Sequence, residues 1–212
     1  MRRACLILIA SITSLAVASA GEFSFTVKSA KPVFVADAVV SLVPLDPALP
    51  LPSAQPAELA QREQEYSAYV TVVQAGATVN FPNRDSVQHH VYSLSKAKKF
   101  ELPLYNPGAA ESFVFDVSGV VTLGCNIHDW MLAYVFVVPT PYFAKTDETG
   151  GGNISAPAGR YRLELWHPRL ASTIKQEVTL ADGPAVQQDF NVTLKPDRRI
   201  RRGPESKSSG YR

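Results

Sequence analysis

The sequence predicts an all-β protein, and three observations support this prediction. Short runs of β-branched and aromatic residues recur along the chain at roughly the 8–12-residue spacing of β-sandwiches. Gly, Pro, Asn and Asp gather between these runs, as they do in turns. No stretch has the apolar period of an amphipathic helix of ordinary length. We therefore expect sandwiches connected by turns and loops.

In the first half of the chain, a Lys-Pro pair separates the first two expected strands, and the sequence PNRDS after residue 81 indicates a turn. Residues 45–56 are rich in Pro and Ala, which favours an extended linker, and residues 58–65 could form a short helix. The strands expected here are 23–28, 38–44, 69–73, 77–81 and 89–94.

In the second half, residues 131–139 (MLAYVFVVP) form the strongest β run of the protein. Gly150, Gly151 and Gly152 indicate a flexible turn. The segment 197–212 has basic, Ser and Gly residues without apolar periodicity, which predicts a disordered basic tail. The strands expected here are 111–115, 120–123, 131–139, 159–166, 176–180 and 188–194.

The N-terminus has the pattern of a secretory signal. Arg2 and Arg3 precede an apolar run over residues 5–17, and small residues follow up to Ala20. The run is too short to favour a permanent anchor. We expect cleavage of residues 1–20, a periplasmic location and no transmembrane segment in the mature chain.

The charge and the cysteine content of the chain exclude some classes of function and point to another. Without the signal, the chain has 19 basic and 19 acidic residues, and without the tail it has 13 and 17. No basic patch with interleaved aromatic residues occurs, so we expect no nucleic-acid partner. Cys125 is the only cysteine left, which excludes a disulfide within the expected monomer. An unpaired thiol in an oxidising compartment is a liability unless it is buried or coordinated, and this points towards a metal.

One segment has the spacing of a metal site. Cys125, His128 and Met131 form a C-x2-H-x2-M motif between two expected strands, and His89-His90 begins an earlier strand. Two imidazoles and one thiolate with a weak thioether are the ligand set of electron-transfer copper. Zinc would gain little from the thioether, so a structural zinc site fits less well.

Each of these residues also has an ordinary explanation. Cys125 could be a buried inert thiol, Met131 a core residue and His128 a surface loop residue. However, the mature chain has only one Cys and one Met, and these lie six residues apart with a His between them. The spacing of the three residues together favours a metal site over three unrelated ordinary roles.

The segments FPNRDSVQHHVYS and GCNIHDWMLAYVFV resemble the cupredoxin family, in particular plastocyanin- and amicyanin-like members and methylamine utilization proteins. The resemblance implies a Greek-key β-sandwich over residues 64–138 that holds one copper ion, cycling between Cu(I) and Cu(II). It also implies ligands at four positions, which are His89, Cys125, His128 and Met131.

The resemblance has one departure, next to the first ligand. Many cupredoxins have an Asn there that hydrogen-bonds towards the Cys loop, and this chain has His90. His90 could do the same towards Asn126, or His90 could itself be the ligand in place of His89. At Gln88, the family brings a backbone carbonyl near the metal.

Two regions that flank the copper segment resemble another family. The sequences KPVFVADAVVSL near residue 31 and APAGRYRL near residue 156 are similar to transthyretin-like, carboxypeptidase-regulatory-like modules. The resemblance implies that residues 22–47 and 143–196 together form one smaller, discontinuous β-sandwich. Residues 48–63 would then link it to the inserted copper domain.

The leading functional hypothesis is an electron carrier between redox partner proteins, and the alternative is copper delivery or storage. We expect no enzyme, because four His residues are too few for a further catalytic copper site and a C-x3-C pair is absent. Trp130 is expected to shield the metal and Asp129 to be a solvated loop residue. For His167 we expect a structural or surface role. A purely structural adhesion module would bind no copper.

Overall fold

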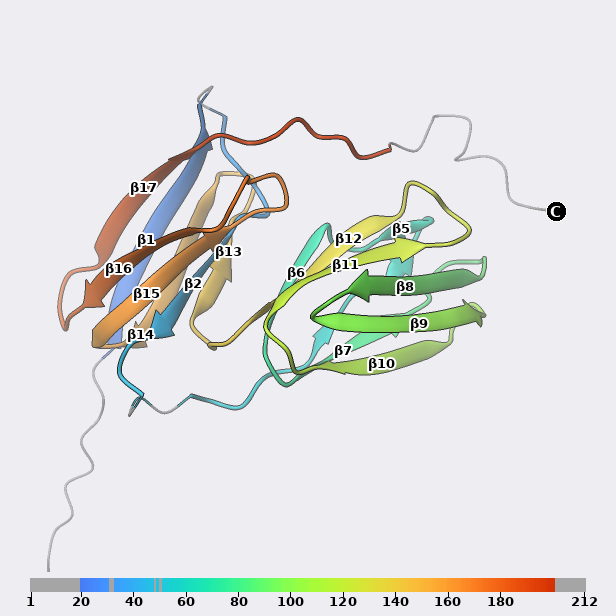
Figure 1. Ribbon diagram of the computed structural model, residues 1–212, viewed down its shortest axis with the longest axis horizontal. Helices are drawn as coiled ribbons and strands as arrows, with labels where there is room; N and C mark the ends of the chain where they lie inside the picture. Colours follow the sequence, from blue (N-terminus) through green and yellow to red (C-terminus); the bar gives the residue numbers. More distant parts are fainter. Residues whose placement is uncertain (1–19, 31–32, 48, 50, 201–212) are drawn as a thin grey trace, which may run out of the picture.

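The computed structural model describes residues 20–30, 33–47, 49 and 51–200, and these residues form strands and no helix. The strands build two β-sandwiches that lie side by side (Figure 1). The all-β prediction is therefore confirmed. None of the described residues belongs to a helix that is long and apolar enough to cross a membrane. The predicted signal, residues 1–20, lies outside the described residues except for Ala20.

We call the first sandwich the terminal sandwich, because its strands come from both ends of the described chain. One sheet has the order β14-β1-β17, and the other has the order β13-β2-β15-β16. The strands of the first sheet are β14 (Gly151–Pro157), β1 (Ala20–Ser29) and β17 (Val186–Val192). Those of the second are β13 (Phe143–Lys145), β2 (Val39–Pro44), β15 (Gly159–Trp166) and β16 (Ile174–Leu180).

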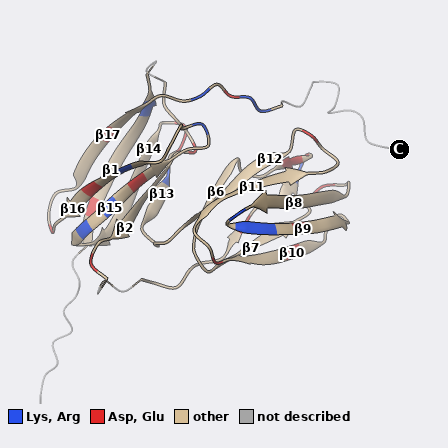
Figure 2. Cartoon of the chain, in the orientation of Figure 1, with Lys and Arg blue, Asp and Glu red and all other residues tan. Residues whose placement is uncertain are grey.

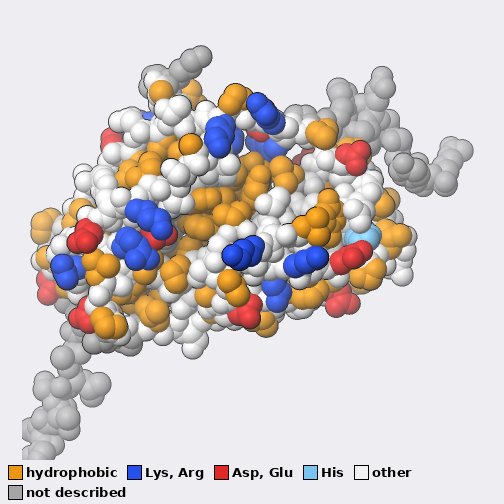
Figure 3. Space-filling model, viewed as in Figure 1, with side chains coloured by type: hydrophobic (Ala, Val, Ile, Leu, Met, Phe, Trp, Pro, Cys, Tyr) orange, Lys and Arg blue, Asp and Glu red, His pale blue; other side chains and the backbone are white. Residues whose placement is uncertain are grey.

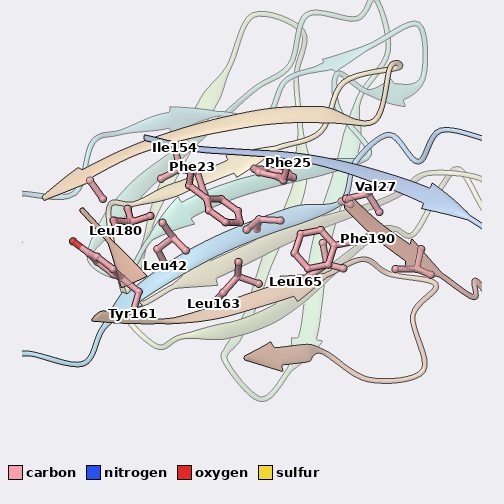
Figure 4. Close-up of a cluster of buried hydrophobic side chains, with 14 of the residues drawn as sticks. Phe23, Phe25, Val27, Leu42, Ile154, Tyr161, Leu163, Leu165, Leu180 and Phe190 are labelled. Atoms are coloured by element: carbon pink, nitrogen blue, oxygen red, sulfur yellow. The ribbon is translucent and has the colours of Figure 1, made fainter. Parts of the chain in front are cut away.

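The core of the terminal sandwich follows from the period of two along its strands. In β1, Phe23, Phe25 and Val27 are buried, and the residues between them are exposed or half-buried. Leu163 and Leu165 of β15 belong to the same buried cluster (Figure 4). The two strands that pair with β1, which are β14 and β17, both lie more than 100 residues later in the chain.

The glycine run after residue 149 differs from its prediction as a flexible turn. Only Gly150 lies in the turn, with φ of 70°, and Gly151 and Gly152 open strand β14. Gly152 pairs with Phe25, and a Cβ on it would lie 2.4 Å from the Phe25 ring. The glycine makes room for that aromatic ring, a requirement that turn statistics do not reveal.

We call the second sandwich the central sandwich. Its larger sheet has the order β6-β12-β11-β8-β9, and its smaller sheet has the order β10-β7-β3. The larger sheet comprises β6 (Val70–Gln74), β12 (Leu132–Val138), β11 (Gly119–Cys125), β8 (His89–Ser95) and β9 (Lys98–Tyr105). The smaller one comprises β10 (Ala110–Phe115), β7 (Ala77–Pro82) and β3 (Ala57–Glu58). Phe81 and Phe115 pack between the two sheets against Leu123.

The predicted linker 48–63 is wrong in its second half, and the predicted short helix at 58–65 is wrong throughout. Residues from Ala57 onwards form β3, which pairs with β7, and a small hairpin of β4 (Gln61–Arg62) and β5 (Glu65–Tyr66). Leu59 is fully buried in the core of the central sandwich. This segment is therefore part of the central sandwich rather than a spacer.

A third apolar cluster joins the two sandwiches. Trp166 of β15 stacks on Phe136 of β12 with ring centroids 4.5 Å apart, and Val39 and Val70 lie in the same cluster. Figure 3 shows apolar side chains in the hollow between the two sandwiches. Lys145 adds polar contacts, because its Nζ donates to the Val70 carbonyl and lies 3.0 Å from an Asp37 carboxylate oxygen.

The chain crosses from one sandwich to the other again after β17 (Figure 1). Residues 197–200 are the described part of the predicted disordered tail, and they make specific contacts. The Arg199 guanidinium lies 3.9 Å from the centroid of the Tyr69 ring and is paired with Asp197. Few charged residues lie on the central strands, apart from the basic start of β9 (Figure 2). Residues 201–212 lie outside the described residues.

Candidate metal centre

Two neighbouring strands bring the proposed ligands to one end of the central sandwich. Cys125 is the last residue of β11, and His89 is the first residue of β8. The two strands are antiparallel, and Cys125 lies opposite Val91, two residues beyond His89. The end of β11 therefore meets the beginning of β8, and the motif loop that follows Cys125 leads into β12.

The side chains of His89, Cys125 and His128 converge. The Cys125 Sγ lies 3.9 Å from the Nδ1 of His89 and 3.6 Å from the Nδ1 of His128. The two imidazole rings have centroids 5.0 Å apart, and the possible ligand atoms of the three residues all lie within 4.8 Å of one another. All three side chains are buried: His89 is 0%, Cys125 6% and His128 4% exposed.

Backbone hydrogen bonds fix the loop that carries the motif. The Asn126 amide donates to the His90 carbonyl at 3.1 Å, and the Met131 amide donates to the His128 carbonyl at 3.0 Å. Met131 is 3% exposed at the end of this turn. Gly124, just before the cysteine, leaves room for the Tyr92 ring, because a Cβ there would lie 2.8 Å from it and the ring would have to shift. The turn therefore has little freedom to move its side chains.

A β-bulge lies beside the first histidine. His89 pairs with Tyr105, but Val91 pairs with Leu102, so β9 contributes one extra residue at this point. Pro103 lies in the extra stretch and has no amide hydrogen to donate to a ladder. A bulge increases the local twist and redirects side chains, and such bulges are frequent next to functional sites.

A carboxylate lies behind the first histidine. The Nε2 of His89 lies 2.7 Å from an oxygen of Asp85, on the side of the ring away from Cys125. Asp85 is held in turn, because its amide donates to the Asn83 side chain and its carboxylate accepts from the Gln64 amide at 2.9 Å. A carboxylate–histidine pair of this kind fixes the ring orientation and makes the other ring nitrogen a stronger metal ligand.

The β4–β5 hairpin contacts the site on two more sides. Glu63 and Gln64 at its tip both have positive φ, of 54° and 58°. The Gln64 carbonyl accepts a hydrogen bond from the Trp130 indole at 2.8 Å, and the Tyr66 hydroxyl donates to the Gly124 carbonyl at 3.0 Å. Trp130 lies against His128, with ring centroids 5.4 Å apart. The hairpin therefore contacts Asp85, the motif loop and the end of β11.

The local electrostatics favour an ionised thiol. Burial raises the pKa of Cys125, but hydrogen bonds from His89 and from the amides of His90 and Ile127 outweigh it and bring the pKa below its usual value. Burial likewise lowers the pKa of His89, but its contacts with Cys125 and Asp85 outweigh it and raise the pKa overall. The thiolate is the form of cysteine that binds metals.

The other predicted residues lie around this cluster. His90 points away from it, towards Glu101 at 2.8 Å, and the Asn126 side chain lies 3.2 Å from its ring. Gln88 is exposed and bonds to Asn106. Asp129 is exposed and Trp130 half-buried. His167 lies at the end of β15 in the terminal sandwich.

Asp85, Gln64 and Tyr66 belong to this site without being part of the sequence motif. The sequence around Asp85 indicates only a turn, although its spacing of four residues before His89 places it on the same connection. Gln64 contributes only backbone groups, so no side-chain motif could identify it. Tyr66 lies 58 residues before its hydrogen-bond partner.

Comparisons with known proteins find similarity to solved copper proteins over part of the chain. No protein-family model matches the sequence, and no curated protein matches it. A purple cupredoxin from Nitrosopumilus maritimus is 28% identical, over 39% of this chain and 99% of that protein, with a TM-score of 0.35. Amicyanin from Paracoccus versutus is 19% identical, over 46% and 91%, with a TM-score of 0.35.

A third similar structure is a copper-containing nitrite reductase from Thermus scotoductus. It is 20% identical, over 39% of this chain and 22% of that protein, with a TM-score of 0.38. The transthyretin-like resemblance of the terminal sandwich stays a prediction. The chain is thus an all-β protein of two sandwiches, with three buried ligand-type side chains at one end of the central sandwich.

Proposed function

We propose that the protein binds one copper ion through His89, Cys125 and His128, with Met131 as a weak fourth ligand, and that it carries single electrons. The observation that carries the proposal is the convergence of two imidazole Nδ1 atoms on one buried sulfur, at 3.9 and 3.6 Å. Metal–nitrogen and metal–sulfur bonds of about 2.0 and 2.3 Å hold two ligand atoms about 3.5–3.7 Å apart at trigonal or tetrahedral angles. The separation of 3.6 Å lies within this range and that of 3.9 Å lies just above it, so both are close to what one shared ion requires.

The kind of ligands supports copper over zinc. Two imidazoles and one thiolate, with the thioether of Met131 six residues after the cysteine, match the electron-transfer copper set, in which the thioether bond is long and weak. A structural zinc site would normally be closed by a fourth strong ligand, such as another thiolate or imidazole. Bound copper would supply a one-electron couple between Cu(I) and Cu(II).

The packing around the ligands supports electron transfer over copper delivery. His128 is enclosed by Trp130 and His89, and Asp85 holds His89 from behind. Ligands fixed in this way move little when the charge of the site changes, so little reorganisation opposes the transfer. A delivery protein would need at least one exposed ligand for exchange, and the three clustered ligands are at most 6% exposed.

The same observations argue against an enzyme. Of the two remaining histidines, His90 is bonded to Glu101, and His167 lies in the terminal sandwich. A second copper site for catalysis would need a set of ligands that these two residues do not supply. We further propose a periplasmic monomer that exchanges electrons with partner proteins, in line with the expected signal.

The experiment that tests the proposal is optical and electrochemical. Copper(II)-loaded protein should show an intense visible thiolate-to-copper charge-transfer band and a reversible one-electron wave. Cys125→Ser should remove the band while the metal-free variant keeps its circular dichroism spectrum. A colourless copper(II) complex would contradict an electron-transfer site. Copper that passes quickly to a chelator, with no reversible wave, would favour delivery instead.

A further inference from the structure

A large cavity lies outside the metal centre, where the terminal sandwich meets Tyr69 of the central sandwich. Its volume is about 730 Å³, and its walls come from the β1–β2 connection, the β15–β16 connection and the segment after β17. Pockets that hold small organic ligands typically measure about 300–1,000 Å³ and often lie between domains. This cavity therefore has both the size and the position of a ligand site.

His167 presents a hydrogen-bond donor to this cavity. The residue is 6% exposed and lines the cavity. Its Nδ1 accepts the backbone amide of Arg169 at 3.1 Å, so the proton of the neutral ring is on Nε2. Burial, followed by the charge of Arg169, lowers the pKa of His167 to about 4, which keeps the ring neutral near pH 7. Among the described residues, Nε2 has no hydrogen-bond partner.

Arg169 adds a cation beside this donor. Its Nε donates to the Lys195 carbonyl at 2.6 Å, which orients the guanidinium group. It forms no salt bridge with any described residue, whereas Arg199 is paired with Asp197. A guanidinium presents its remaining donors in a planar fork that matches a carboxylate. Both residues line the cavity, so each can offer a donor to an anion bound there.

The acidic residues that line the cavity oppose this pair only weakly. The Asp37 carboxylate is paired with Lys145, whose Nζ lies 3.0 Å away. Glu148 is exposed to solvent, where water and salt screen its charge. Among the described residues that line the cavity, Arg169 is thus a half-buried cation that forms no salt bridge.

Another part of the wall is apolar. Val33 and Phe34 of the β1–β2 connection line the cavity and are 62% and 51% exposed, which is high for large apolar side chains. The ring of Tyr69 lies on the side of the central sandwich, beneath Arg199. A ligand with an apolar body would cover these surfaces and remove them from water.

We propose that this cavity binds a small organic carboxylate with an apolar or aromatic body. The carboxylate accepts from the Arg169 guanidinium and from Nε2 of His167, and the body packs against Val33 and Phe34. The site is independent of the metal centre, because it shares no residue with it. The surface where the two sandwiches meet therefore has a binding role of its own.

The test uses the whole mature protein and sodium benzoate as the probe, with isothermal titration calorimetry as the measurement. Benzoate should bind one site per chain, and Arg169→Gln and His167→Phe should each weaken the binding at least tenfold. The matched control is Arg160→Gln, an exposed arginine of β15 that does not line the cavity, and it should bind as the parent protein does. Circular dichroism of each variant checks the fold, and Arg169→Gln decides the matter if His167→Phe does not fold.

Two further probes test the chemical class. Acetate, which lacks the apolar body, should bind at least tenfold more weakly than benzoate, and so should inorganic phosphate. Phosphate binding equal to that of benzoate would overturn the assignment to organic carboxylates. Benzoate binding that is absent at millimolar concentration, or that is unchanged in folded Arg169→Gln, would overturn the site itself.

Discussion

At the scale of single residues, the ring of His89 lies between a thiol and a carboxylate. One nitrogen faces the Cys125 sulfur, and the other lies 2.7 Å from the Asp85 carboxylate. The carboxylate is 9% exposed, so little water screens its charge. A buried negative charge behind a ligand stabilises the more highly charged state of a metal in front of it.

This contact predicts the effect of Asp85→Asn. The loss of the carboxylate should lower the affinity for copper(II) by about 10–100-fold. With the affinity for copper(I) unchanged, the reduction potential should rise by roughly 60–120 mV, since a tenfold change corresponds to about 59 mV for one electron. Voltammetry measures the shift. Glu101→Gln, at the exposed carboxylate beside His90, is the control and should move the potential little. A potential that falls or stays constant in Asp85→Asn would contradict this role.

The two adjacent histidines predict opposite outcomes. His89→Ala should remove the charge-transfer band or change the type of copper site, because it deletes a buried group 3.9 Å from the sulfur. His90→Ala should keep the band, because that ring contacts Glu101 and Asn126 on the other side of the strand. Absorption and electron paramagnetic resonance spectra separate the two. Loss of the band in His90→Ala alone would reverse the ligand assignment.

The residues around the candidate site could be predicted from the sequence only where a motif carries them. The unique Cys and Met of the mature chain, six residues apart with a His between them, identify the loop. Asp85 acts through a contact that only the folded turn creates, and Gln64 acts through its backbone. Neither has a residue type that a copper motif would require.

At the scale of elements, the β4–β5 hairpin is the clearest departure from the sequence prediction. Its strands are only two residues long, so neither helix nor strand periodicity can be detected in them. Its conformation depends on contacts with the central sandwich, such as the amide of Arg84 that donates to the Gln61 carbonyl. The sequence pattern does not predict β9 either, because Pro103 and the charged start of this strand lower its β propensity. The long apolar runs, by contrast, were predicted correctly as strands.

The hairpin predicts a measurable effect of Tyr66→Phe. Burial raises the pKa of Tyr66 well above its usual value, so the hydroxyl keeps its proton and donates to the Gly124 carbonyl. Its loss should destabilise the metal-free protein by about 0.5–1.5 kcal/mol. A thermal melt should show a fall of roughly 1–6 °C for a chain of this size. Tyr92→Phe is the control, because the Tyr92 hydroxyl has no described hydrogen-bond partner. Equal melting temperatures for Tyr66→Phe and the parent would contradict the role of the hairpin.

At the scale of the whole molecule, the central sandwich interrupts the terminal one between β2 and β13. β1 is the middle strand of one terminal sheet, and β2 pairs with both β13 and β15 in the other. The C-terminal strands alone would therefore lack an inner strand in each sheet. The transthyretin-like module over residues 22–47 and 143–196 stays a prediction from the sequence resemblance. The apolar cluster of Trp166 and Phe136 could not be predicted, because that contact depends on how the two sandwiches dock.

This arrangement predicts how fragments behave. A fragment of residues 143–196 should be unfolded, whereas the same residues joined by a flexible linker to residues 20–47 should fold. A fragment of residues 51–139 should hold copper and melt at a higher temperature than one of residues 64–138, which lacks the buried Leu59 and Gln61. Circular dichroism melts of the four fragments show which of them fold and at what temperature each one unfolds. A cooperative transition in 143–196 alone would refute the shared arrangement.

The parallel pairing of β1 with β17 has a mechanical consequence. The register runs from Phe23 opposite Val186 to Ser29 opposite Val192, so the chain enters β1 and leaves β17 at opposite ends of the pair. Tension applied across the protein from residue 20 to residue 192 would load this whole ladder of hydrogen bonds in shear, rather than opening it one bond at a time. The central sandwich joins the chain between β2 and β13, outside this line of force. The applied force would therefore act on the terminal sandwich, and the geometry of the metal centre would not change.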